Sequence, residues 1–240
     1  MMMLGITTAT PRGSVALVEE GRLVGRASYE GEMHHAERIF GALDELLTDV
    51  GVDRQSLGAV GCDVGPGSFT GIRAGLAAAK GIALGLGVPL LGVGSLEAMA
   101  AAAWAEPALP ELDRVVCLLD ARRGETFFAA YDRCLGLVAG PGHVRTPELL
   151  AALGELGRAT GVGFVGRQAS VLCPPLDRAR VVDREACSLP DAEWIARLAQ
   201  TRIEHGEGPP LGDVEPVYLR APDAVQPAAG AGPGPGGWRP

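Results

Sequence analysis

The chain has 240 residues, of which 47% are hydrophobic and 5% aromatic, and its formal net charge is −8. This length is enough for one large domain or two smaller lobes, each with its own core. A protein that grips nucleic acid alone normally carries a basic face. The sequence has no lysine and arginine cluster of that kind, so we expect any RNA contact to be made mainly through a partner.

The cysteines and the apolar segments indicate a cytoplasmic protein. The five cysteines include no C-x-x-C pair, which favours free thiols in a reducing compartment. The first residues lack the basic and long apolar stretches of a signal peptide. Residues 81–96 are uncharged, but they contain proline and glycine and are short for a bilayer span, so we expect buried core and no membrane contact.

The first half of the chain predicts three strands and then alternating helices and strands. Residues 14–19 and 23–29 flank a short connection with glycine and predict a hairpin. Residues 36–50 carry an apolar stripe at helical spacing and end before Gly51, which suits a helix C-cap. Ser95 is expected to cap a further helix. The remaining expected elements are strands over residues 4–8, 57–64 and 88–93 and helices over residues 69–86 and 96–105.

The second half predicts a smaller lobe. Strands are expected over residues 115–120 and 126–131, joined by a polar turn with Arg122, Arg123 and Glu125. An exposed turn and a contact with a partner or tRNA both remain open for these three residues. Further expected elements are strands over residues 135–139, 162–165, 180–183 and 214–219 and helices over residues 147–156 and 191–205.

This order of elements is typical of a duplicated α/β lobe, as in the actin-like ATPases and sugar kinases. We therefore predict a two-lobed, actin-like (ribonuclease H-like) α/β fold with mixed sheets. Residues 1–106 form the expected N-terminal lobe, and residues 107–220 form a shortened C-terminal lobe. Residues 221–240 are dominated by proline, glycine and alanine and are expected to be disordered.

A glycine-rich turn, Gly-Cys-Asp-Val-Gly-Pro-Gly-Ser-Phe-Thr-Gly over residues 61–71, is the most informative motif. It matches neither G-x-x-x-x-G-K-[ST] nor G-x-G-x-x-G, because no lysine follows and Thr70 stands where the last glycine is needed. An anion site at the helix N-terminus and a tight turn capped by Ser68 or Thr70 both remain open. The candidate anion or nucleotide contacts are Gly65, Gly67, Ser68, Thr70 and Arg73.

The helix after this turn is unusually smooth. Each glycine in an isolated helix costs about 0.8–1 kcal/mol relative to alanine, so this helix should be stable only when it is packed on both sides. One side would lie on a sheet, and the other on the helix over residues 36–50 or on a partner protein. The small-residue side is formed by Gly71, Ala74, Ala78, Gly81 and Gly85, and the opposite side by Ile72, Leu76, Ala79, Ala83 and Leu86.

Three segments together resemble one family. They are Leu-Gly-Ile-Thr-Thr-Ala-Thr at residues 4–10, Met-His-His-Ala-Glu-Arg at 33–38, and Asp-Val-Gly-Pro-Gly-Ser-Phe-Thr-Gly-Ile-Arg at 63–73. The sequence resembles the TsaB (YeaZ) family of tRNA threonylcarbamoyladenosine biosynthesis proteins over most of residues 4–220. The run Gly-Pro-Gly-Ser-Phe-Thr-Gly-x-Arg is the most specific part of this resemblance.

The resemblance implies a non-catalytic subunit that activates a homologous transferase, TsaD, which modifies the adenosine next to the tRNA anticodon. It implies ATP or ADP and a divalent metal in the partner subunits, a TsaE-type ATPase as a further partner, and tRNA contact through the complex. It assigns this chain no catalytic residue, no metal and no cofactor of its own. The implied docking helices match residues 36–50 and 70–86, and a homodimer through the same surface remains open. The candidate interface residues are Ile39, Phe40, Leu43, Leu46, Leu47, Ile72, Gly75, Leu76, Ala79 and Ala83.

Two other functions remain as alternatives: an actin-like ATPase or kinase, and a glycopeptidase-like protein. Thr7 stands where the family usually has aspartate, which counts against an ATP site because threonine positions metal and phosphate poorly. His34, His35 and Glu37 do not form the H-E-x-x-H motif, and a solvated helix start is favoured over a metal site. Cys62 is expected to be an inert core thiol.

Overall fold

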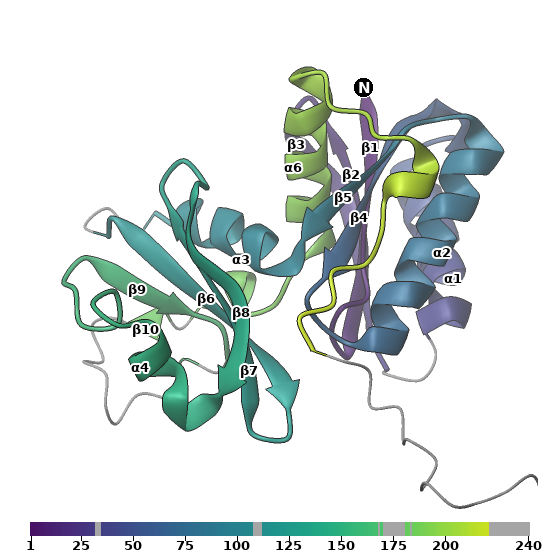
Figure 1. Cartoon of the computed structure of the whole chain (residues 1–240). Coiled ribbons are helices and arrows are strands. Elements are labelled where there is room, and N and C mark those ends of the chain that lie inside the picture. Colours follow the sequence, from purple (N-terminus) through teal and green to yellow (C-terminus); the bar gives the residue numbers. More distant parts are fainter. Residues whose placement is uncertain (32–34, 108–111, 168, 170–180, 183, 221–240) are drawn as a thin grey trace, which may run out of the picture.

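The computed structural model describes residues 1–31, 35–107, 112–167, 169, 181–182 and 184–220. The predicted disorder of residues 221–240 lies outside this range, as do His34 and the outer residues of the strand expected over 180–183. The described residues form two lobes, each built on a five-stranded mixed sheet (Figure 1).

The first sheet has the strand order β3-β2-β1-β4-β5. Its centre is β1, which pairs antiparallel with β2 and parallel with β4. Glu20 and Gly21 both have positive φ between β2 and β3, as a two-residue hairpin turn requires. The strands are β1 (Met2–Thr7), β2 (Arg12–Glu19), β3 (Arg22–Glu30), β4 (Leu57–Gly65) and β5 (Leu90–Gly94).

The second sheet repeats this arrangement. Its order is β8-β7-β6-β9-β10, so the first, second, third, fourth and fifth strands of each lobe occupy equivalent positions. The predicted duplication and the two-lobed fold class are confirmed. The strands are β6 (Arg114–Arg122), β7 (Glu125–Asp132), β8 (Leu137–Arg145), β9 (Val162–Val165) and β10 (Val181–Val182).

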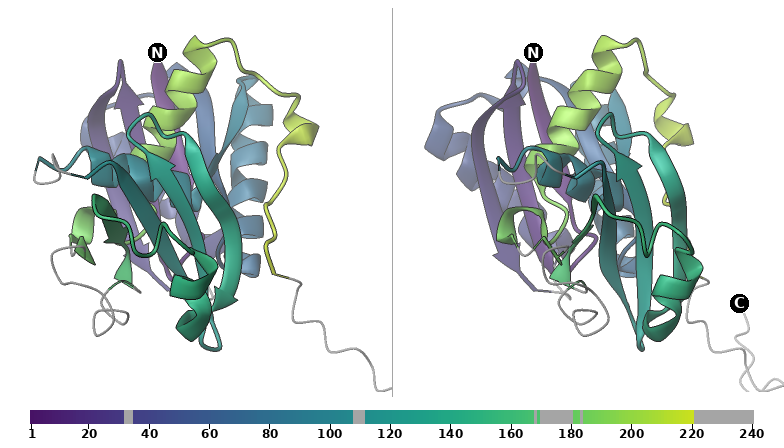
Figure 2. Two further views of the ribbon diagram at one scale, coloured as in Figure 1. Left: turned by 60° about the vertical axis from the view of Figure 1, so that its left-hand side comes forward. Right: turned by 90° about the vertical axis from the view of Figure 1, so that its left-hand side faces the viewer.

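The helices lie in layers around these sheets. α1 (His35–Val50) and α2 (Phe69–Leu86) cover the outer face of the first sheet. α3 (Ser95–Trp104) and α6 (Ala192–Glu204) lie between the two sheets (Figure 2). The short α4 (Leu149–Ala152) covers the remaining face of the second sheet.

The ends of α2 follow the sequence signals closely. The Ser68 hydroxyl accepts a hydrogen bond from the Gly71 N–H, and Gly87 ends the helix with a left-handed φ of 69°. Ser95, in contrast, does not cap α3, because Gly94 occupies the cap position without a side-chain bond. The Ser95 hydroxyl instead donates to Asp63, so its role depends on a residue far away in the sequence.

Three expectations about the second half need correction. α6 packs on the first sheet, where Ile195, Ala196 and Ala199 join its inner core, so residues 107–220 do not form one continuous lobe. Residues 214–219 form no strand, although the Val217 N–H donates to the Val64 carbonyl. The helix expected over residues 147–156 is reduced to α4, which follows a 3-10 turn, η2 (Thr146–Glu148). The other short 3-10 helices are η1 (Arg54–Ser56), η4 (Glu185–Cys187) and η5 (Leu211–Asp213).

Candidate functional site

The glycine-rich turn lies at the cleft between the lobes. Two cavities meet there, of about 270 and 550 Å³, and Ser68, Asp120 and Arg122 line both. Gly67 and Thr70 also line the smaller cavity, whereas Gly65 and Arg73 line neither. The structure therefore brings three of the five candidate anion contacts to the cleft.

The turn is packed tightly against the segment that follows β1. The Ser68 N–H donates to the Ala9 carbonyl over 2.7 Å. A Cβ atom on Gly67 would lie 2.3 Å from that oxygen, and one on Gly71 would lie 2.1 Å from the Thr8 carbonyl oxygen. Only glycine fits at these two positions, so close contact between two turns of this chain is sufficient to explain them.

Hydrogen bonds within the chain use several groups that could otherwise hold an anion. The Ser68 N–H and hydroxyl are committed to Ala9 and to the helix cap. Arg73 lies 3.8 Å above the Phe69 ring, and its Nε donates to the Tyr218 hydroxyl. This geometry favours the capped tight turn, while anion binding stays a prediction.

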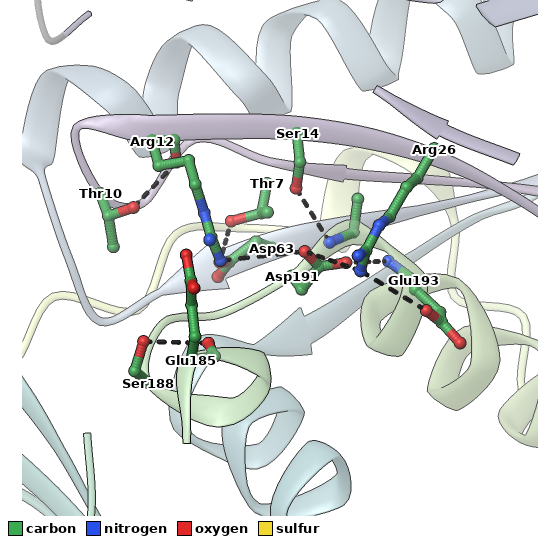
Figure 3. Close-up of polar contacts among 11 residues, drawn as sticks. Thr7, Thr10, Arg12, Ser14, Arg26, Asp63, Glu185, Ser188, Asp191 and Glu193 are labelled. Carbon is green, nitrogen blue, oxygen red and sulfur yellow. Dashed lines mark hydrogen bonds and ion pairs between the residues drawn. The ribbon is translucent and has the colours of Figure 1, made fainter. Parts of the chain in front are cut away.

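Asp63 is a buried acid that sequence reasoning did not assign to the site. Its carboxylate accepts hydrogen bonds from the Thr7 hydroxyl at 2.6 Å, the Ser95 hydroxyl at 2.5 Å and the Gly65 N–H at 2.9 Å. Figure 3 shows the Thr7 hydroxyl pointing at this carboxylate. Burial raises the pKa of Asp63 to about 6, although the three hydrogen bonds lower it. A single acid in an otherwise apolar strand was the available sequence signal.

The network around Asp63 also explains the role of Thr7. An aspartate at position 7 would place a second carboxylate beside Asp63 in a buried site, and like charges there disfavour ionisation. Threonine instead donates a hydrogen bond and is itself buried. The pair therefore ties β1 to β4, which supports a structural role for these strand ends.

A second polar cluster in Figure 3 holds α6 in place. Asp191 caps α6 and lies 3.9 Å from the guanidinium groups of Arg12 and Arg26. The Ser14 hydroxyl accepts a hydrogen bond from the Ala192 N–H over 3.0 Å. These contacts join the start of α6 to β2 and β3, so we assign this cluster to docking of α6 on its sheet.

The candidate interface residues need a correction. All but Phe40 are buried within this chain, where they join α1 and α2 to the first sheet and to each other. Gly75 is among them, because a Cβ atom there would lie 2.2 Å from the Thr8 hydroxyl oxygen. These side chains expose little or no area on the single chain, and their contact with a partner stays a prediction. They are Ile39, Leu43, Leu46, Leu47, Ile72, Gly75, Leu76, Ala79 and Ala83.

The exposed sides of the same two helices form a different surface, which we call the outer helical face. It consists of Phe40 and Gly41 on α1 and Ala77, Gly81, Leu84 and Gly85 on α2. Phe40 is 47% exposed and Leu84 is 73% exposed. Nothing lies within 4 Å of a Cβ atom built on Gly41, Gly81 or Gly85, so packing inside this chain does not require those glycines.

Of the other candidate residues, His34 lies outside the described residues, whereas His35 and Cys62 are described. The expected solvated helix start is wrong for His35, which is buried at the start of α1 with its ring 5.7 Å from that of Tyr29. Within the described part of the chain, no three histidine, cysteine, aspartate or glutamate side chains gather where they could hold a metal ion. Cys62 is buried, and burial raises the pKa of its thiol, as expected for an unreactive core cysteine.

The polar turn between β6 and β7 is exposed. Arg122, Arg123 and Gly124 all have positive φ there, and a contact with tRNA or a partner stays a prediction. Glu125, at the start of β7, lies 3.4 Å from both the His143 imidazole and the Arg220 guanidinium. As for the membrane, none of the helices within the described ranges is long and apolar enough to cross one.

The comparisons with known proteins agree with the sequence resemblance. Residues 29–159 match the family model described as TsaD, tRNA N6-adenosine threonylcarbamoyltransferase. The chain is 39% identical over 228 residues to the tRNA threonylcarbamoyladenosine biosynthesis protein TsaB of Escherichia coli (strain K12), with 92% of this chain and 95% of that protein covered. A solved structure of YeaZ from Pseudomonas aeruginosa aligns with a TM-score of 0.73 at 28% identity, covering 91% of this chain and 99% of the other.

The share of the relative that is covered differs between TsaB proteins and the transferases. The tRNA N6-adenosine threonylcarbamoyltransferase of Nitratidesulfovibrio vulgaris (strain DP4) is 31% identical over 206 residues. That match covers 77% of this chain but only 51% of the transferase. Nearly the whole of the Escherichia coli TsaB protein is covered, in contrast.

Proposed function

Because the chain belongs to the TsaB (YeaZ) family of tRNA threonylcarbamoyladenosine biosynthesis proteins, we propose that it is a non-catalytic subunit that docks onto a TsaD-type transferase and activates it. The observation that carries this proposal is the outer helical face. Three glycines there have open space around them, although each glycine inside a helix costs about 0.8–1 kcal/mol relative to alanine. Glycines at these positions would allow a helix of the partner to approach closely, because they carry no side chain.

The exposed apolar side chains support the same surface. Leu84 is the most exposed large hydrophobic side chain among the described residues, and Phe40 also projects from this face. Both helices belong to crossovers between parallel strands, so they run in the same direction across the sheet. Their exposed sides therefore offer a two-helix platform that suits a homologous pair of helices on the transferase.

Cleft chemistry gives less support to a catalytic function for this chain. One side of the glycine-rich turn is packed against Ala9, and the buried Asp63 accepts hydrogen bonds from three donors of the chain itself. We therefore propose that any ATP or ADP and divalent metal are held by the partner subunits. A TsaE-type ATPase and tRNA join through the complex, and we propose the cytoplasm as its location.

The proposal is tested with Leu84→Glu and a matched control, Leu137→Glu on β8, where the leucine is 52% exposed. We expect Leu84→Glu to weaken binding to a TsaD-type transferase at least about tenfold, a change of about 1.4 kcal/mol, and to lower reconstituted tRNA modification. The control should bind and activate normally. Equal affinity of both variants would reject the docking face, and modification that needs no added chain would reject the activating role.

The same purified proteins test the homodimer and the kinase or ATPase alternative. Analytical ultracentrifugation of the free chain tests a homodimer, which Leu84→Glu should dissociate if it uses the outer helical face. ATP turnover by the purified chain alone, with a Ser68→Ala variant beside it, tests the kinase or ATPase alternative. A turnover rate that depends on Ser68 would contradict the non-catalytic assignment.

A further inference from the structure

The segment over residues 214–220 connects the two lobes on the side of the cleft. It follows α6 and η5 and runs beside α2 toward the second lobe (Figure 1). Pocket-lining residues of the smaller cavity include Val217, Tyr218, Leu219 and Arg220. This segment therefore forms part of the cleft wall, and its two ends are anchored in different lobes.

The anchors on the first lobe are both apolar and polar. Val214 is buried in the core beneath α2. The Val217 N–H donates to the Val64 carbonyl over 2.7 Å at the end of β4. The Tyr218 ring lies 4.9 Å from the Phe69 ring, and its hydroxyl accepts the hydrogen bond of Arg73. Two of these partners, Phe69 and Arg73, belong to the first turns of α2.

The anchors on the second lobe involve the last two residues. Leu219 packs against the core formed by α3, β6 and β7. The Arg220 guanidinium donates to the Ala121 carbonyl over 2.7 Å and lies 3.4 Å from the Glu125 carboxylate. Arg220 thus engages both strands that flank the exposed turn of the second lobe.

We propose that residues 214–220 act as an interlobe strap that holds the two lobes at one degree of closure. Behind the cleft, α3 and α6 join the lobes, and Arg202 of α6 pairs with Glu97 of α3 over 2.7 Å. The strap adds a second attachment on the other side of these helices. With both attachments in place the lobes cannot rotate freely, and loss of the strap leaves a hinge at α3.

The strap also gives the proposed docking helix a route to the cleft. Two of its first-lobe anchors, Phe69 and Arg73, belong to α2, so a partner bound to that helix stabilises their arrangement with Tyr218. Closure of the lobes then depends on partner binding. This coupling rests on the proposed function, whereas the strap itself does not and is tested in the free chain.

The test measures the distance between the lobes by pulsed electron spin resonance. One spin label is placed on Cys134, which is exposed in the second lobe, and one on Thr48→Cys, which is exposed on α1. Cys173 is replaced by serine, and the remaining cysteines are buried. We expect one narrow distance distribution in the parent and a longer, broader one in Tyr218→Ala and Arg220→Ala. Tyr218→Phe keeps the ring contact with Phe69, so its distance distribution should be intermediate between that of the parent and that of Tyr218→Ala.

A control and a second measurement keep this test decisive. Arg54→Ala removes an exposed ion pair with Asp44 and should leave the distribution unchanged. Hydrogen exchange at the Val217 N–H should be at least about tenfold faster in Tyr218→Ala while the core amides remain protected. An unchanged distance distribution in folded Tyr218→Ala and Arg220→Ala would overturn the strap.

Adding the TsaD-type transferase tests the coupling separately. It should narrow the distance distribution of Tyr218→Phe toward that of the parent. If the transferase binds without this effect, the coupling fails and the docking proposal stands. If the transferase does not bind the parent chain at all, the docking proposal fails and the strap is judged from the free chain alone.

Discussion

The two lobes share a strand order but differ in what covers their sheets. The outer face of the first sheet carries α1 and α2, with 16 and 18 residues, whereas the described residues on the corresponding face of the second sheet include the four-residue α4 and the buried Ala169. The first lobe also has the glycine-rich turn and the buried Asp63 at the end of β4. The equivalent strand β9 reads Val-Gly-Phe-Val and has no acid.

The shared strand order concerns folding, whereas the open glycines on α1 and α2 concern recognition of a partner. One sheet topology supports both lobes, so the strand order alone does not explain the features of the outer face of the first lobe. The two helices on that face have glycines that packing inside the lobe leaves unused at Gly41, Gly81 and Gly85. The buried sides of these helices form the core of the lobe, and we propose that the three open glycines serve binding of a second protein.

The largest expected effect comes from comparing the two sides of α2. Gly75→Leu should lower the free energy of unfolding by about 3 kcal/mol or more, because the new side chain collides with Thr8 in a packed core. Gly81→Leu, on the outer helical face, should fold with a stability equal to or above that of the parent but lose affinity for the transferase. Denaturant unfolding measures both variants. Similar stability of the two would contradict the assigned faces of the helix.

The next effect concerns Asp63, which the second lobe lacks. Its pKa of about 6 in the folded chain is above the ordinary value of 3.8, so between pH 4 and pH 6 the folded chain binds more protons than the unfolded one. Stability from this group is therefore present at low pH and is lost as the pH rises through 6. Relative to Asp63→Asn, the parent should lose roughly 2–3 kcal/mol over this range. If the free energies of unfolding of the parent and of Asp63→Asn depend on pH in the same way, this pKa is wrong.

The smallest effect is a gain in stability at an open glycine. Gly81→Ala should raise the free energy of unfolding by up to about 1 kcal/mol, since alanine is the better helix former and nothing obstructs its methyl group. The same change should weaken binding to the transferase if a partner helix approaches closely. Thermal unfolding measures the change in stability, and titration calorimetry measures the change in affinity for the transferase. Improved stability with unchanged affinity would show that the partner does not reach this position.

Local signals were sufficient to predict much of the first lobe. Ser68 and Gly87 set the ends of α2, and the spacing at Glu20 and Gly21 set the first hairpin. These features depend on neighbouring residues, so a single sequence contains them. The predicted boundaries of α2 match the structure for that reason.

Long-range contacts account for the errors. Leu84 and several alanines and glycines are spread around α2, so periodicity alone could not show which residues stay exposed. Ser95 carries the signature of a helix cap but bonds to Asp63, 32 residues earlier in the chain. The return of α6 to the first sheet and the strap over residues 214–220 likewise depend on packing between distant segments.

The central claim is that a TsaD-type transferase covers the outer helical face, and site-specific labelling tests it most directly. A cysteine is introduced as Leu84→Cys or, for comparison, as Leu137→Cys, in a chain with Cys134→Ser and Cys173→Ser. The rate of maleimide labelling is then measured with and without saturating transferase. The account predicts strong protection at position 84 and none at position 137. Equal labelling of position 84 in the free chain and in the complex would contradict it.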